Sequence, residues 1–158
     1  ISKNQNVYFS YAKANKEPNR TDYENGTPKP ESLDDYELGW KFANHKNQIN
    51  INGFYMLYHD QLVLTGALDN VGNVIRTNVG KSYRVGLEVD ALINFAKKWS
   101  IRPNLTLSEN KNIDFVNNNG TNFENLGNTN IAFSPKIVAG NILNFKAIKN
   151  WDISLLSK

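Results

Sequence analysis

Apolar and polar residues alternate almost without a break from Tyr83 to Leu107, with one short interruption at residues 96–98. The apolar positions are Tyr83, Val85, Leu87, Val89, Ala91, Ile93 and Phe95, then Trp99, Ile101, Pro103, Leu105 and Leu107. Successive side chains of a β-strand point to opposite faces, so this period predicts two strands, each with one apolar face. Both runs exceed the usual strand of about 5–6 residues. They reach the roughly 9–11 tilted residues that cross a bilayer.

Five further stretches show the same period and bring the predicted strands to seven. Their marker positions are Val7, Phe9 and Tyr11; Tyr36, Leu38, Trp40 and Phe42; Ile49, Ile51, Tyr55 and Leu57; Ile131, Phe133, Ile137, Ala139 and Leu143; and Trp151, Ile153 and Leu155. Because the runs follow one another along the chain, we expect a single antiparallel meander in which each strand pairs with its chain neighbours.

The segments between these strands alternate in length. The long polar loops are predicted at Asn15–Ser32, Val63–Ser82 and Glu109–Asn130, and the short links at Ala43–Gln48, Ala96–Lys98 and Lys146–Asn150. Strand direction alternates, so all long loops fall at one end of the sheet. Outer-membrane barrels have this asymmetry, with short periplasmic turns and longer outside loops.

Aromatic and charged residues give the two faces different character. The aromatic residues beside the short links are Phe42, Phe95, Trp99, Phe145 and Trp151, as in the aromatic girdle of a barrel. The charged residues inside the long runs are Arg84, Glu88, Asp90 and Arg102. They would be costly in lipid, so we expect them to face a polar lumen, either as a solvated wall or against a plug or solute. The predicted fold class is all-β, an antiparallel transmembrane β-barrel meander.

Composition narrows the function classes further. The 158 residues have a mean hydropathy of -0.53 and contain no cysteine, which removes disulfides, zinc–thiolate sites and thiol nucleophiles together. The net charge of +3 is spread along the chain, so no nucleic-acid surface is expected. His45 and His59 have no second ligand at metal spacing, and we predict no metal or cofactor. No nucleophile–base pair is found, so we predict no catalytic residues and no enzyme.

The chain contains a short segment that is similar to the end of a phosphate-binding loop but lacks the rest of that motif. The sequence Gly80-Lys81-Ser82 lacks the required upstream glycine, since Ile75 stands there, and no helix pattern follows. Asp34 is expected to face away from Asp35 and Glu37 on a strand, so these carboxylates form no acid–base dyad.

Several short motifs, in series, resemble the TonB-dependent receptors. The first is the strand Asn6–Ala12, followed by Lys16–Arg20, the proline–glutamate segment Pro28–Ser32 and the strand Asp35-Tyr36-Glu37-Leu38-Gly39. The segment Phe54–Leu62 is similar to the next strand of that family. Asn78-Val79-Gly80, with Gly86-Leu87-Glu88 after it, is similar to its "N-x-G, then G-x-E" strand. The resemblance covers nearly the whole chain.

The resemblance implies a barrel of 22 strands filled by an amino-terminal plug. Residues 1–158 would be a partial barrel from its carboxy-terminal half, with the plug domain and the remaining strands absent. It further implies a multi-pass position in the bacterial outer membrane, contact with lipid, and coupling to the TonB complex through the plug. The solute would be small and scarce, and the strand series is more similar to iron-carrier (siderophore) receptors than to the glycan-importing branch. No ligand-binding residue carries over, because the outside loops vary most.

The residues alone also indicate an incomplete protein. The chain opens on Ile1 without a signal peptide and stops within an alternating run, and seven strands are few for a bacterial barrel, which has an even number from 8 upward.

Two other readings stay open on the residues alone. One is a soluble, lipocalin-like barrel that binds a ligand inside, although its interior would have to hold Trp40, Trp99 and Trp151 as well. The other is a cell-surface structural or adhesin barrel.

Overall fold

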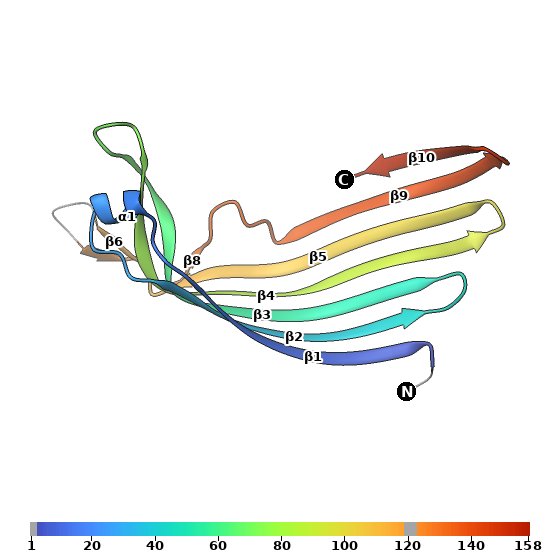
Figure 1. Cartoon of the computed structure of the whole chain (residues 1–158), viewed down its shortest axis with the longest axis horizontal. Coiled ribbons are helices and arrows are strands. Elements are labelled where there is room, and N and C mark those ends of the chain that lie inside the picture. Colours follow the sequence, from blue (N-terminus) through green and yellow to red (C-terminus); the bar gives the residue numbers. More distant parts are fainter. Residues whose placement is uncertain (1–2, 119–122) are drawn as a thin grey trace.

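Seven long antiparallel strands form one curved sheet in chain order, in a computed structural model that describes residues 3–118 and 123–158 (Figure 1). They are β1 (Gln5–Lys16), β2 (Glu31–Ala43), β3 (Gln48–Leu68), β4 (Val74–Ala96), β5 (Trp99–Ile113), β9 (Ile137–Ile148) and β10 (Trp151–Ser157). The predicted all-β meander is confirmed, since every neighbouring pair is antiparallel. The sheet does not close on itself, and β1 and β10 form its edges.

The smaller elements all lie at one end of the sheet, and the short turns lie at the other (Figure 1). Helix α1 (Arg20–Glu24) follows β1, while β6 (Val116–Asn118) and β7 (Phe123–Asn125) make a separate hairpin. The two-residue strand β8 (Thr129–Asn130) pairs with β5. The predicted loop asymmetry is therefore confirmed. In the described part of the chain, no helix is long and apolar enough to cross a membrane.

The second predicted loop, Val63–Ser82, is wrong, because most of it is strand. β3 and β4 continue well beyond their neighbours and pair as far as Leu68 with Val74. Glycines and polar residues suggested a loop, but Gly80 lies within β4, and of the three glycines in this segment only Gly66 and Gly72 have a positive φ, at 83° and 88°. Gly66 falls at the irregular register between Leu64 and Leu68, and Gly72 lies in the turn.

The third predicted loop and the sixth strand also need correction. β5 runs on to Ile113, and the described parts of Glu109–Asn130 hold β6, β7 and β8, while 119–122 lie outside the described residues. The sixth strand starts only at Ile137, so Ile131 and Phe133 do not belong to it. Phe133 is fully exposed with a φ of 57°, and Pro135, two residues later, has no N–H to donate to a ladder.

Helix α1 fixes the first long loop to the extended β3–β4 hairpin. Asn19 and Asp22 form a capping box, in which each side chain accepts a hydrogen bond from the backbone of the other. Asp22 is buried and lies 3.5 Å from a guanidinium nitrogen of Arg76 on β4. The Asn78 side chain adds a second tie, because it accepts from the Lys29 N–H and donates to carbonyls of Lys29 and Asp60. The helix was not predicted, although Asn19 and Asp22 have the spacing that announces it.

Almost no apolar side chain is buried. Among the described residues, the buried apolar side chains besides Pro18 are Leu62 and Val79, at 9% and 6% exposure, and both lie in the hairpin that extends beyond the sheet. Large side chains such as Phe9, Leu38 and Phe95 are 59% exposed or more. A water-soluble domain of this size would bury an apolar core, so the apolar face needs another covering.

Candidate functional site

The two faces of the sheet differ in chemistry across the middle of the strands. One row of cross-strand partners runs Trp40, Ile51, Val89, Leu105 and Ala139. The row beside it, one residue away on each strand, runs Lys41, Asn50, Asp90, Asn104 and Gly140. Because neighbouring residues of a strand face opposite ways, the first row belongs to an apolar face and the second to a polar face.

Aromatic rings line the apolar face beside the short turns. The Trp99 ring lies between Phe95 and Phe145, with centroid distances of 6.5 and 4.4 Å. Trp40 and Phe42 stack at 6.1 Å on the other side of the first short turn. Amphipathic rings favour the boundary between lipid and water, so this row is suited to a membrane interface.

A second aromatic row, which the sequence analysis missed, crosses the other end of the apolar face. It consists of Tyr11, Tyr36, Tyr55 and Tyr83, with successive ring centroids 5.0, 6.5 and 6.3 Å apart. On β4 the two rows are ~12 residues apart, which is about 40 Å of strand, or about 28 Å across a membrane at 45° tilt. This matches the apolar band of about 25 Å expected between the girdles of a barrel. The sequence did hold a signal for part of this row. Counting residues along both strands from the first short turn pairs Tyr36 with Tyr55.

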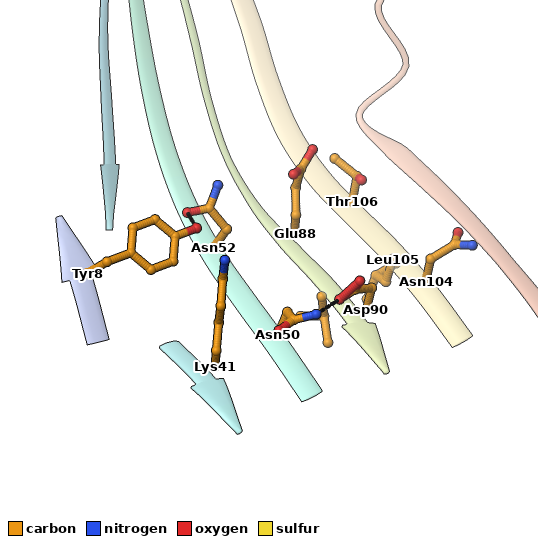
Figure 2. Close-up of a pocket in the computed structure, with 10 residues that line it drawn as sticks. Tyr8, Lys41, Asn50, Asn52, Glu88, Asp90, Asn104, Leu105 and Thr106 are labelled. Carbon is orange, nitrogen blue, oxygen red and sulfur yellow. Dashed lines mark hydrogen bonds between the residues drawn. The ribbon is translucent and has the colours of Figure 1, made fainter. Parts of the chain in front are cut away.

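The polar face carries a hollow of about 420 Å³ over β1 to β5 (Figure 2). Its polar lining is Tyr8, Lys41, Asn50, Asn52, Glu88, Asp90, Asn104 and Thr106. The Tyr8 hydroxyl donates to Asn52 Oδ1 at 3.1 Å, and Asn50 Nδ2 donates to Asp90 Oδ2 at 2.7 Å. The Lys41 ammonium lies 4.8 Å from the centre of the Tyr8 ring.

Glycines let aromatic rings cross this face. A Cβ at Gly39 would collide with the Tyr8 ring, and one at Gly86 would collide with Phe54. Each ring thus covers a cross-strand glycine, an arrangement that fills the gap left by the missing side chain. The Tyr8 ring thereby reaches Asn52, two strands away.

The structure brings together three of the four charged residues predicted to line this face. Glu88 and Asp90 border the first hollow, and Asp90 and Arg102 border a neighbouring one of about 380 Å³. Arg84 shares their face but borders neither hollow. Its guanidinium instead lies 4.4 Å from the centre of the Tyr58 ring. The position of Arg84 depends on a cross-strand neighbour, which alternation along one strand does not identify.

Carboxylates, amides, two hydroxyls and an ammonium give the polar face many hydrogen-bonding groups in an open setting. Such a surface can contact water, a polar solute or a solvated protein segment. Among the described residues, no group of three His, Asp or Glu side chains could hold a metal ion.

Asp34 faces away from Asp35 and Glu37, since it pairs with Leu57 of the apolar face. His59 Nε2 lies 3.8 Å from the Asp34 carboxylate.

Comparison with known proteins identifies the architecture. A family model described as TonB dependent receptor-like, beta-barrel matches residues 1–156. No curated protein matches the chain in sequence. Among solved structures, the siderophore receptor PirA from Pseudomonas aeruginosa is similar with a TM-score of 0.71 and 16% identity, over 99% of this chain and 28% of PirA.

Two further structures are similar over 99% of this chain. The copper transporter OprC gives a TM-score of 0.69 at 15% identity over 24% of its own length. The ferric yersiniabactin uptake receptor FyuA from Yersinia pestis gives 0.63 at 21% identity over 23%. The chain thus spans about a quarter of these proteins. The fold likeness and the family match together confirm the resemblance predicted from the sequence motifs: this chain belongs to the TonB-dependent receptors, as a part of their β-barrel.

Proposed function

We propose that this chain is a section of the wall of a receptor in the bacterial outer membrane that imports a scarce solute, with an iron carrier as the solute. The observation that carries the proposal is the pairing of an apolar face, bordered by two aromatic rows, with a polar face. Only a closed barrel satisfies all backbone groups of a sheet in lipid, so the open edges at β1 and β10 require the remaining strands of a larger wall.

The choice of an iron carrier is supported by the similar structures. PirA is described as a siderophore receptor and FyuA as a ferric yersiniabactin uptake receptor. OprC is described as a copper transporter, which makes copper the competing solute. The function proposed is binding and transport, with no catalytic step.

The polar face would contact a plug domain held inside the barrel. Glu88 and Asp90 are exposed at the first hollow, and Arg102 is exposed beside Asp90. Exposed carboxylates and a guanidinium on a lumen wall can form ion pairs and hydrogen bonds with such a domain. The plug would in turn pass on the energy supplied by the TonB complex.

The lipocalin-like and adhesin alternatives are not retained, because residues 1–156 match the receptor-barrel family. A lipocalin binds its ligand on an apolar inner face. Here the hollow of about 420 Å³ is bordered mainly by charged and amide side chains of the polar face, and the apolar side chains point the other way.

Uptake by the full-length receptor tests the proposal. We expect cells that depend on this receptor to accumulate radioactive iron from at least one ferric siderophore, and to lose that uptake when TonB is deleted. The growth and copper content of these cells under copper limitation should not depend on the receptor. Copper uptake without iron uptake would replace the solute, and uptake that persists without TonB would contradict the coupling.

A pair of conservative substitutions tests the contact with the plug. Glu88→Gln together with Asp90→Asn keeps side-chain size but removes both charges, so the plug should become easier to digest with protease in the intact receptor. Glu24→Gln, which removes an exposed carboxylate of helix α1, is the control and should leave digestion unchanged. Equal digestion of all three proteins would show that these carboxylates do not hold the plug.

A further inference from the structure

The short turns of the sheet carry only basic charge. They comprise residues 44–47, 97–98 and 149–150, and their ionisable residues are His45, Lys46, Lys97, Lys98 and Lys149. All five side chains are exposed. The opposite end of the apolar face differs, because there Lys13 pairs with Asp34 at 3.8 Å and Lys111 with Glu109 at 3.6 Å.

Hydrogen bonds hold the first two of these turns against the ends of neighbouring strands. The backbone N–H of Asn94 donates to Asn47 Oδ1 at 2.9 Å, and the Asn94 side chain donates to the Lys46 carbonyl. The Lys98 ammonium donates to the Ala147 carbonyl at 2.9 Å, which joins the second turn to the end of β9. The basic residues are therefore arranged along one edge of the sheet.

A hollow of about 430 Å³ lies between the first two turns. It is lined by His45, Lys46, Asn94, Phe95, Ala96 and Lys97. The Phe95 ring is 59% exposed and continues into the aromatic row through Trp99. The hollow thus combines two ammonium groups with an aromatic ring of the apolar face.

We propose that this hollow binds an anionic phospholipid, with its phosphate between Lys46 and Lys97 and its acyl chains along Phe95. The inference rests on the proposed position of the sheet in a membrane. There, the aromatic row lies at the boundary between acyl chains and headgroups. Lysines placed just beyond that row meet the headgroup layer, where an anionic surface attracts them. An uncharged or zwitterionic headgroup would leave the turns without a counter-charge.

Lipid retention by the full-length receptor tests this site. The receptor is reconstituted in bilayers of phosphatidylethanolamine and phosphatidylglycerol and extracted in mild detergent, and the retained lipids are quantified by mass spectrometry. We expect the receptor to retain phosphatidylglycerol selectively, and Lys46→Gln with Lys97→Gln to reduce that selectivity roughly tenfold at low salt. The matched control is Lys13→Gln with Lys111→Gln, which removes the same charge at the opposite end and should retain selectivity.

Each alternative outcome contradicts the proposal. Unchanged lipid selectivity in the Lys46/Lys97 variant would exclude the site. An equal loss of selectivity in the Lys13/Lys111 control would show that the net charge of the receptor, and not this hollow, attracts the lipid. Retention needs insertion but not import, so a receptor that carries no iron still tests the lipid site. A wild-type receptor that fails to insert into bilayers would contradict the proposed function instead.

Discussion

At the scale of single residues, the direction of a side chain decides its environment. Leu105 and Thr106 are neighbours on β5, yet Leu105 pairs with Val89 on the apolar face, whereas Thr106 pairs with Glu88 at the polar hollow. The alternation of apolar and polar residues was enough to predict the directions of these two side chains. It could not predict that Tyr8 reaches Asn52, because that contact depends on the register of three strands.

Arginine substitutions should separate the two faces. Leu87→Arg and Leu105→Arg place a cation in lipid near mid-membrane, and each should cost about 2–4 kcal/mol of unfolding free energy. Thr106→Arg should cost much less, because its side chain points into the polar hollow. Urea unfolding of the full-length barrel in lipid measures all three. Similar losses at positions 105 and 106 would contradict the assignment of the faces.

At the scale of elements, strand lengths were harder to predict than strand identities. The centres of β4 and β5 follow from alternation, but their outer ends contain polar residues that suit loops and solvated strands equally well. Val63 and Leu64 were predicted to lie at the start of a loop, yet they pair with Thr77 and Arg76 of β4. That pairing is supported from outside the hairpin by α1 and Glu31, whose carboxylate accepts the Leu62 N–H at 2.9 Å.

The tie between α1 and β4 should control the first outer loop. Asp22→Ala removes a capping-box partner and leaves Arg76 without its buried carboxylate, so the docked loop should lose about 1–3 kcal/mol. Glu24→Ala removes only the exposed pair with Arg20, worth about 0.3–0.5 kcal/mol. Protease nicking between Asn19 and Glu31 on intact cells should rise for the first variant only. Equal nicking of both would mean that the buried pair does not hold the loop.

The tip of the β3–β4 hairpin should open in acid. The backbone N–H of Asn73 donates to the Asp69 carboxylate, and this bond holds the pKa of Asp69 below its ordinary value of 3.8. A lowered pKa means that ionised Asp69 stabilises the turn, so the contribution is present at neutral pH and lost as pH falls through that lowered pKa. A nitroxide label at Val71 should become more mobile as pH falls through the lowered pKa of Asp69. In the Asp69→Asn variant the mobility of the label should not change with pH. A mobility transition that persists in Asp69→Asn would assign it to another group.

At the scale of the whole molecule, the sheet has two faces, two free edges and almost no core of its own. Its family could be predicted from the series of strand motifs, because each motif joins a strand to a specific turn or loop residue. The solute could not, because nothing in the chain's alternation constrains the outer loops that would meet it. The missing core is explained if lipid covers the apolar face and the barrel interior covers the polar face.

The placement of the two ends of the sheet across the outer membrane tests this account most directly. An epitope tag after Val71, at the exposed tip of the β3–β4 hairpin, should be labelled by antibody on intact cells that make the full-length receptor. A tag between Lys97 and Lys98, in a short turn, should be labelled only after the outer membrane is permeabilised. The reverse pattern, or labelling of both tags on intact cells, would contradict the membrane topology and with it the identification of this sheet as a receptor wall.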